Sequence, residues 1–328
     1  MFVSTIIPTK NRPQLLKTAL ESVAGQTYRD MEVIVVDEGS RAEHRQLNEQ
    51  VVAAFGPAFK YLFLPSHNPI GSGPSYTRNV GLAAATGDLV AFCDDDDFWC
   101  DRRHIETAVA ALASNSLLDM VFANQETRVG GELQRSIWMP SLVARLPPAS
   151  RSSDAVIPVA KRDCLIDDHG HPNTCVFRRQ LLTEIGGFWE RVRYLEDLDL
   201  FVRAVDRARV VGYRPQTVSV HNVPDRTKQV NASTQVDAAE KKVVQISVAN
   251  HIMLSCDSRE AHRFAGRLAG YTYRDLALQA SAAGHRELAS AFGKVALMWL
   301  PTWKWALYTV GLATKSLAAA LRPGSRRW

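Results

Sequence analysis

The chain has too few cysteines, in the wrong spacing, for a disulfide framework or a cysteine-rich zinc site. Its five cysteines are an odd number among 328 residues, and no two of them form a Cys-x-x-Cys pair. Domains stapled by disulfides and structural zinc sites are therefore excluded, and a reducing cytoplasm fits best. Residues 1–9 also lack a basic stretch followed by a long apolar core, so we expect a first strand there rather than a signal peptide.

The glycine motifs of the common nucleotide-dependent enzymes are missing as well. No Gly-x-Gly-x-x-Gly follows the first apolar run, and the chain has neither a Gly-x-x-x-x-Gly-Lys-Ser/Thr phosphate loop nor a Gly-x-Ser-x-Gly elbow. These absences argue against dinucleotide oxidoreductases, nucleoside triphosphatases and serine hydrolases. The net charge of +5 is too small to indicate nucleic acid as a partner, although it suits an anionic substrate or membrane surface.

The most informative stretch is 89–99, where a short apolar run ends in four consecutive aspartates and two aromatic residues. The run indicates a buried strand, which places the acids at the strand end where open α/β sheets bind ligands. Adjacent carboxylates repel one another, and a divalent cation offsets this repulsion. If the chain stays extended, Asp94 and Asp96 share one face. Asp95 and Asp97 then share the other, from which an acid can cap a following helix.

Apolar runs alternate with helical periodicity over the first hundred residues. We predict strands at 2–7, 31–36, 61–64 and 88–93, and helices at 13–25, 41–54 and 75–85. This alternation predicts right-handed crossovers and a mostly parallel sheet flanked by helices. Parallel strands bring their carboxyl ends to one edge, so Thr9, Asp37 and Asp94 are expected to converge on a binding site.

The second half of the chain carries weaker signals and then changes character. We predict helices at 101–114 and 196–208 and strands at 118–122, 133–138, 210–213 and 218–220, with an irregular segment at 140–172. Beyond residue 236 the sequence is alanine-rich and helical. We therefore expect a domain at 1–236 and a helical region at 237–328. Its tryptophan-rich section, 295–321, fits either an interfacial membrane helix or a helix packed on protein.

Five motifs in order resemble family 2 glycosyltransferases, which have the GT-A fold. They are Ile6 to Arg12, Val33 to Ser40, Arg78 to Leu82, Gly87 to Trp99, and Glu196 to Leu200. The resemblance covers about residues 1–222, and it departs mildly at Glu38, where the family often has a second aspartate. It implies a half of about 1–100 that binds a nucleotide sugar and a half of about 101–236 that binds the acceptor.

The resemblance also implies roles for single residues. The implied substrate-binding set is Pro8, Thr9, Arg12, Asp37, Glu38, Arg78, Asp94, Asp95, Glu196 and Arg226. Within it, Thr9 and Asp37 would contact the nucleoside. Arg78 would lie by the base or phosphates, and Asp94 would hold the ribose. For Arg78 the alternative is a surface arginine in an ion pair.

A metal site and a catalytic base follow from the same resemblance. Asp96 would bind Mn²⁺ or Mg²⁺, with His221 as a further ligand, and the metal would stabilise the departing diphosphate. His221 has a purely structural role as its alternative. Asp197 resembles the catalytic base, and its place in the first turn of a helix favours the carboxylate form. The alternative is that Glu196 and Asp197 are ordinary acids of a helix N-terminus.

The implied reaction is inverting transfer from a nucleotide-diphosphate sugar to a glycan or lipid-linked acceptor, in polysaccharide or glycoconjugate synthesis. A cytoplasmic enzyme in peripheral contact with the inner membrane face is expected, and a homo-oligomer stays open. The alternatives are a sugar nucleotidyltransferase, which usually has glycines where residues 8–13 have none, and a non-catalytic nucleotide-sugar-binding module. His169 and His171, with Asp167 and Asp168, form a polar group to which no role is assigned.

Overall fold

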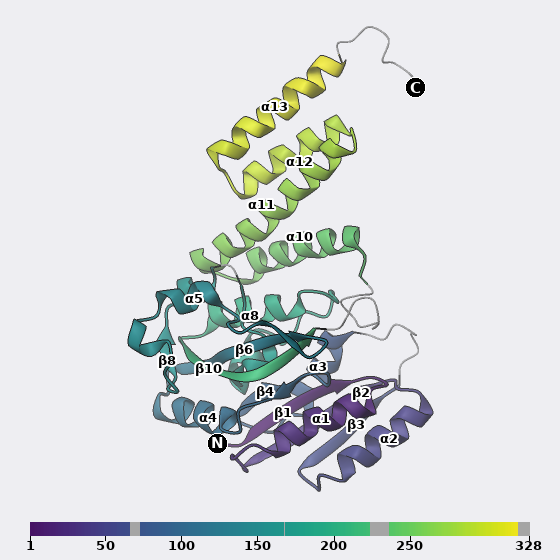
Figure 1. The fold of residues 1–328 in the computed structure, drawn as a ribbon, viewed down its shortest axis with the longest axis vertical. Helices are drawn as coiled ribbons and strands as arrows, with labels where there is room; N and C mark the ends of the chain where they lie inside the picture. The colour runs from purple at the N-terminus through teal and green to yellow at the C-terminus, as the bar shows by residue number, and fades with distance from the viewer. Residues whose placement is uncertain (66–72, 167, 224–235, 321–328) are drawn as a thin grey trace. The chain divides into compact units, whose positions relative to one another are not determined.

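The computed structural model describes residues 1–65, 73–166, 168–223 and 236–320 (Figure 1). The sequence-predicted site residue Arg226 lies outside the described residues, as does Asp167 of the polar group to which no role is assigned. The chain divides into two compact units, Met1–Asp237 and Ala238–Trp328.

Ten strands of the described chain form one sheet in the first unit. They are β1 (Val3–Thr9), β2 (Met31–Glu38), β3 (Phe59–Leu64), β4 (Leu89–Phe92), β5 (Phe98–Trp99), β6 (Leu118–Val129), β7 (Glu132–Arg135), β8 (Ile157–Val159), β9 (Val176–Arg178) and β10 (Val210–Val223). The order is β3-β2-β1-β4-β9-β6-β10-β5, with β7 beside β6 and β8 beside β10. The predicted α/β fold with a mostly parallel central sheet and a helical C-terminal region is confirmed.

Antiparallel β9 is inserted between β4 and β6 and divides the sheet into two parallel groups. On one side β1, β2, β3 and β4 pair in parallel, and on the other β6 pairs in parallel with β10. The carboxyl ends of β1, β2 and β4 therefore meet at one edge, as the sequence predicted. The two strands predicted at 210–213 and 218–220 are one strand, β10, whose register shifts between Arg214 and Thr217 around Pro215.

Helices cover both faces of this sheet (Figure 1). They are α1 (Pro13–Ala24), α2 (Ala42–Ala53), α3 (Pro74–Ala84), α4 (His104–Ser114), α5 (Pro140–Arg145), α6 (Lys161–Cys164), α7 (Arg179–Glu184) and α8 (Glu196–Arg207), with 3-10 turns η1 (Pro148–Ser150) and η2 (Pro172–Thr174). The segment 140–172, predicted as irregular, holds four of these short elements, β8 included, and η2 begins at its last residue. Elements of three to six residues are too short for periodicity to reveal.

The central strand β1 is buried on both faces, which explains its uninterrupted apolar sequence. Ile7 joins a cluster with Leu16 of α1 and Ile105 of α4 on one face. Ile6 points to the other face, where α3 approaches so closely at Gly81 that a β-carbon there would collide with the Ile6 side chain. This close approach fixes α3, and with it Arg78, over the carboxyl edge of the sheet.

The second unit is helical. Its helices are α10 (Ala238–Ser255), α11 (Arg259–Ala282), α12 (Arg286–Trp299) and α13 (Trp303–Ala320). Helix α11 packs against α10 and α12, and α12 packs against α13. The apolar section predicted at 295–321 is divided between α12 and α13 at Pro301. Within the described chain, no helix combines the length and apolarity that crossing a bilayer requires.

A buried histidine at the start of α4 makes the stability of the first unit depend on pH. His104 is almost fully buried against Trp99, with ring centroids 5.0 Å apart, and its Nε2 has no hydrogen-bond partner in the described structure. Burial lowers the pKa of His104 to about 3, and the nearby Arg214 guanidinium adds to the shift against the opposing charge of Asp101. The imidazole is therefore neutral in the folded protein at neutral pH.

Because the unfolded chain takes up a proton near pH 6.5 and the folded His104 does not, stability falls as the pH drops below 6.5. Between pH 7 and pH 5 we expect this residue alone to remove about 2 kcal/mol. In urea unfolding followed by tryptophan fluorescence, the free energy of unfolding of wild type minus that of His104→Leu should become more negative by about that amount between pH 7 and pH 5. A difference that stays constant with pH would contradict the argument.

Candidate active site

The four aspartates after β4 form a tight turn, and their side chains contact groups from several other segments of the chain. The amide of Asp97 donates to the carbonyl of Asp94 at 3.2 Å, and β5 begins directly afterwards. The prediction that these residues continue the strand with alternating faces is therefore wrong. Helix capping by Asp95 or Asp97 is wrong too, because the next helix, α4, begins only at His104.

Arg12, just before α1, holds the two central aspartates. Its Nη1 lies 3.2 Å from Oδ1 of Asp95 and 2.9 Å from Oδ2 of Asp96, and the Thr9 hydroxyl donates to Asp95 at 2.7 Å. Burial raises the pKa of Asp96, and the neighbouring carboxylates of Asp97 and Asp95 raise it further against the opposing charge of Arg12. The predicted residues Thr9, Arg12, Asp95 and Asp96 thus form one group. Arg12 carries one positive charge and faces two carboxyl groups, so it compensates the negative charge of this group only in part.

Arg78 of α3 bridges the first aspartate to the acidic start of α8. Its Nη2 lies 2.6 Å from Asp94 and its Nη1 lies 3.3 Å from Glu196. The arginine is buried, so the surface ion pair offered as its alternative is wrong. Burial raises the pKa of Asp94, but the charge of Arg78 and its hydrogen bond outweigh burial and lower that pKa below its usual range. For Glu196, burial and the charge of Asp197 prevail and raise the pKa.

The last aspartate, Asp97, forms a group with two histidines that can hold a metal ion. Its Oδ2 lies 2.8 Å from Nδ1 of His221 at the end of β10, and the ligand atoms of Asp97, His171 and His221 all lie within 4.8 Å of one another. Asn173 and the amide of Asn222 also donate to Asp97 and fix its orientation. The predicted ligand His221 belongs to this group. Asp96 faces Arg12 instead, so its role as a ligand stays a prediction.

The two histidines of this group differ in protonation. Burial lowers the pKa of His171 to about 4, and His221 contributes to the shift, so His171 is neutral and offers a lone pair. Burial lowers the pKa of His221 as well, but Asp97 outweighs it and raises that pKa to about 9. A metal at this site would displace the proton of His221. One carboxylate and two imidazoles are a set of donors that suits divalent first-row metals.

Asp197, the predicted catalytic base, lies in the first turn of α8 and pairs with His169. Nε2 of His169 is 2.9 Å from Oδ2 of Asp197, and the Leu198 amide donates to Oδ1 at 2.8 Å. Burial raises the pKa of Asp197, but His169 outweighs it and holds that pKa well below its usual range. Asp197 is therefore a carboxylate at neutral pH. Leu195, before the helix, has a φ of 63°, a left-handed conformation that leucine seldom adopts.

The nucleoside residues predicted on β1 and β2 lie at the same edge. Asp37 is fully buried and accepts from the Ser40 amide at 2.9 Å, from Asn48 at 2.8 Å and from the Tyr61 hydroxyl at 2.6 Å. These contacts hold the turn after β2. They leave no exposed carboxylate surface, so base recognition by Asp37 stays a prediction. Glu38 accepts from the Gly73 amide at 3.2 Å, and Pro8 lies in β1.

Sequence reasoning gave no role to His169 and His171 and left Asp97 in doubt. For the two histidines the available signal was their His-x-His spacing, which places two imidazoles on one side of an extended segment, followed by η2. Nε2 of His171 lies 4.0 Å from Asp94 and 3.9 Å from Asp197. His171, a member of the candidate metal site, thus also lies near the predicted ribose-binding acid and the predicted base.

Removing Arg78 should leave two buried carboxylates without their partner. We expect Arg78→Met to lower the free energy of unfolding by about 3–5 kcal/mol in urea denaturation. Adding Glu196→Gln to that variant should restore at least about 1 kcal/mol, because one of the two uncompensated charges is gone. A loss below about 1 kcal/mol for the single variant would show that the ion pairs contribute little.

The family model for glycosyl transferase family 2 matches residues 4–185, more than half of the chain. A protein described as a glycosyltransferase of Haemophilus influenzae is 23% identical over 244 residues, 74% of each chain. The GalNAc(5)-diNAcBac-PP-undecaprenol beta-1,3-glucosyltransferase of Campylobacter jejuni is 35% identical over 95 residues, which are only 29% of each chain.

Solved structures show the same fold at low sequence identity. Residues 1–349 of S. aureus TarS with UDP-GlcNAc superpose with a TM-score of 0.65 at 18% identity, over 92% of this chain and 82% of that one. The mannosyltransferase PcManGT from Pyrobaculum calidifontis, with GDP-Man and Mn²⁺, gives a TM-score of 0.56 at 19% identity, over 99% and 88%.

Proposed function

The chain belongs to glycosyl transferase family 2 and is a glycosyltransferase with the GT-A fold, and from this we propose that it is a metal-dependent, inverting enzyme. It transfers a sugar from a nucleotide-diphosphate donor to an acceptor hydroxyl. Structural neighbours that hold UDP-GlcNAc or GDP-Man support this class of donor.

One observation carries the proposal: a single imidazole, His171, lies about equally near Asp94 and Asp197 and belongs to the candidate metal site. A donor whose ribose meets Asp94 and whose diphosphate meets the Asp97 group would present its sugar toward Asp197. Donor, metal and base then fit one compact site, which a direct displacement requires.

The metal in this proposal is Mn²⁺ or Mg²⁺, held by Asp97, His171 and His221. Two imidazoles favour Mn²⁺, because Mg²⁺ prefers an all-oxygen shell. When bound, the metal supplies Lewis-acid stabilisation of the diphosphate. Asp96, the ligand predicted from the sequence, joins this shell only if it releases Arg12.

Asp197 is the base in this proposal. Its carboxylate form is stabilised by His169 and by the start of α8, so it can accept the acceptor's proton at neutral pH as the hydroxyl attacks the anomeric carbon. Attack from the face opposite the leaving diphosphate gives inversion. Glu196, whose pKa is raised, binds the acceptor or orients Asp197.

The proposal also includes the roles of the two halves, the acceptor and the membrane contact that were predicted from the sequence. Residues 1–100 bind the donor and residues 101–236 the acceptor, and Arg226 contributes to diphosphate binding. The acceptor is a glycan or a lipid-linked glycan, and the enzyme serves polysaccharide or glycoconjugate synthesis. It works at the inner face of the membrane through peripheral contact of its C-terminal helices.

Nucleoside diphosphates should reveal the donor site directly. We expect one of UDP, GDP, ADP or dTDP to raise the melting temperature in the presence of Mn²⁺ and to do so much less without it. Asp97→Asn should abolish the metal-dependent part. Asp96→Asn should leave it if Asp96 is bound to Arg12 as in this structure. Well-folded protein that responds to no nucleotide would overturn the donor assignment.

If Asp197 is the catalytic base, its replacement should reduce turnover and leave donor binding intact. Asp197→Asn should lower kcat by a factor of about 10²–10⁴, because the amide cannot accept the proton, while the nucleotide-induced rise in melting temperature persists. Asp206→Asn, in the last turn of the same helix, is the matched control and should keep full turnover. Equal activity of the two variants would exclude Asp197 as the base. Donor binding by a wild type without turnover would favour a binding module.

A further inference from the structure

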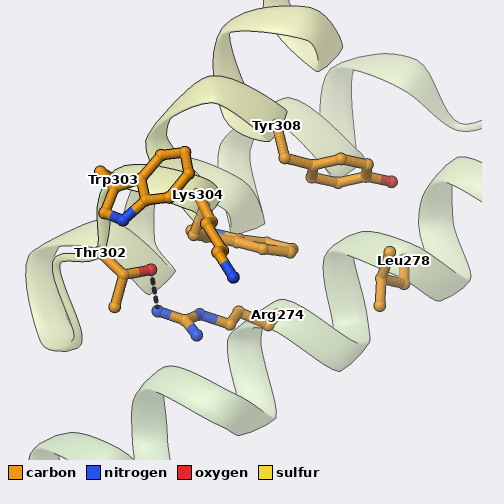
Figure 2. A pocket seen from close by; sticks show the side chains of 7 residues that line it. Arg274, Leu278, Thr302, Trp303, Lys304 and Tyr308 are labelled. Carbon is orange, nitrogen blue, oxygen red and sulfur yellow. Dashed lines mark hydrogen bonds between the residues drawn. The ribbon is translucent and has the colours of Figure 1, made fainter.

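The second unit contains an aromatic, positively charged pocket of about 530 Å³ between α11 and the start of α13 (Figure 2). Its lining consists of Arg274, Leu278, Thr302, Trp303, Lys304, Trp305 and Tyr308. Figure 2 shows the cationic ends of Arg274 and Lys304 directed into the same space. The lining contains no aspartate, glutamate, asparagine or glutamine.

Arg274 at the floor of the pocket retains donor capacity. Its Nη2 donates to the Leu300 carbonyl at 2.7 Å and to the Thr302 hydroxyl at 3.0 Å. Its Nε is buried and has no hydrogen-bond partner within the described chain. The guanidinium carbon lies 5.3 Å from the ring centre of Trp305, so the charge is held against an aromatic face. A buried unpaired donor beside a second cation favours an anionic ligand.

An exposed apolar stripe runs along α13 next to the pocket. Trp303, Leu307 and Val310 are 70%, 66% and 61% exposed. Their spacing of four and three residues places them on one face of the helix, and Lys304 and Tyr308 lie about 100° further round. Large apolar side chains at this spacing normally face a core. Here nothing in the described chain covers them.

We propose that this pocket binds the phosphate of an anionic phospholipid, while Trp303, Leu307 and Val310 enter the boundary between headgroups and acyl chains. Tryptophan and lysine at the edge of an apolar helix face are the anchors that interfacial helices use. Sugar hydroxyls are usually bound by carboxylate and amide side chains, and the lining has none; one of its two hydroxyls, that of Thr302, already accepts from Arg274. Charge and apolar surface together therefore point to a lipid.

This inference deepens the membrane contact of the proposed function, but it rests on the second unit alone. Vesicle binding needs no donor, metal or acceptor. A protein that does not bind vesicles could therefore still be a transferase. Equally, a protein without transferase activity could still bind vesicles.

The test is flotation of the full chain with vesicles of phosphatidylcholine alone or of phosphatidylcholine and phosphatidylglycerol at 7:3. We expect the partition coefficient to be roughly tenfold or more higher on the anionic vesicles, because each basic residue near such a surface contributes about 1 kcal/mol. Equal binding to both vesicles, or binding to neither, would overturn the proposal.

Two pairs of variants separate the site from general charge and apolarity. Lys304→Glu should lower binding to the anionic vesicles about tenfold or more. Lys294→Glu, an exposed residue of α12 with the same charge change, should lower it clearly less. Likewise, Leu307→Ser should weaken binding more than Leu254→Ser, although Leu254 is 87% exposed. Equal effects within either pair would refute the assigned site. All four positions are exposed, so folding should be preserved, as circular dichroism can verify.

Discussion

The repulsion among four adjacent carboxylates is the constraint on which the rest of the first unit depends. A turn that carried them alone would be strongly destabilised, so each is met by a group from another segment. Arg78 comes from α3 to Asp94, Arg12 from the start of α1 to the central pair, and His221 from β10 to Asp97. The acidic turn therefore gathers segments that are distant in sequence. What remains uncompensated is the charge that a bound cation would neutralise.

The features that could be predicted from the sequence are those that local patterns encode. Buried strands, helices with an apolar face and the meeting of Thr9 and Asp94 at one edge all follow from periodicity and from the parallel crossovers. The Thr9 hydroxyl contacts the side chain of Asp95, the residue next to Asp94, which shows how close together the two strand ends lie. The resemblance supplied Arg78, Asp197 and His221, which the structure brings to the same region.

The remaining features depend on contacts that no local pattern carries. β9 is only three residues long, and its antiparallel place between β4 and β6 depends on pairing partners 55–89 residues away in sequence. That insertion brings η2, and with it His171, to the acidic turn. Tertiary contacts also decide whether the polar residues after a strand such as β4 continue the strand or form a turn. The turn at Asp94–Asp97 was therefore missed, and with it the direction of Asp97.

The irregular register of β10 has a consequence for how this site tolerates change. His221 lies at the end of the strand, beyond the shift at Pro215, and side chains along a strand alternate between the two faces of the sheet. Loss or gain of a single residue near Pro215 would turn His221 away from Asp97 without touching either residue. Insertions in the exposed and half-buried segment 147–153 face no such parity rule. Length variation among relatives should therefore be even-numbered or absent in β10, whereas odd-numbered changes should also occur in that segment.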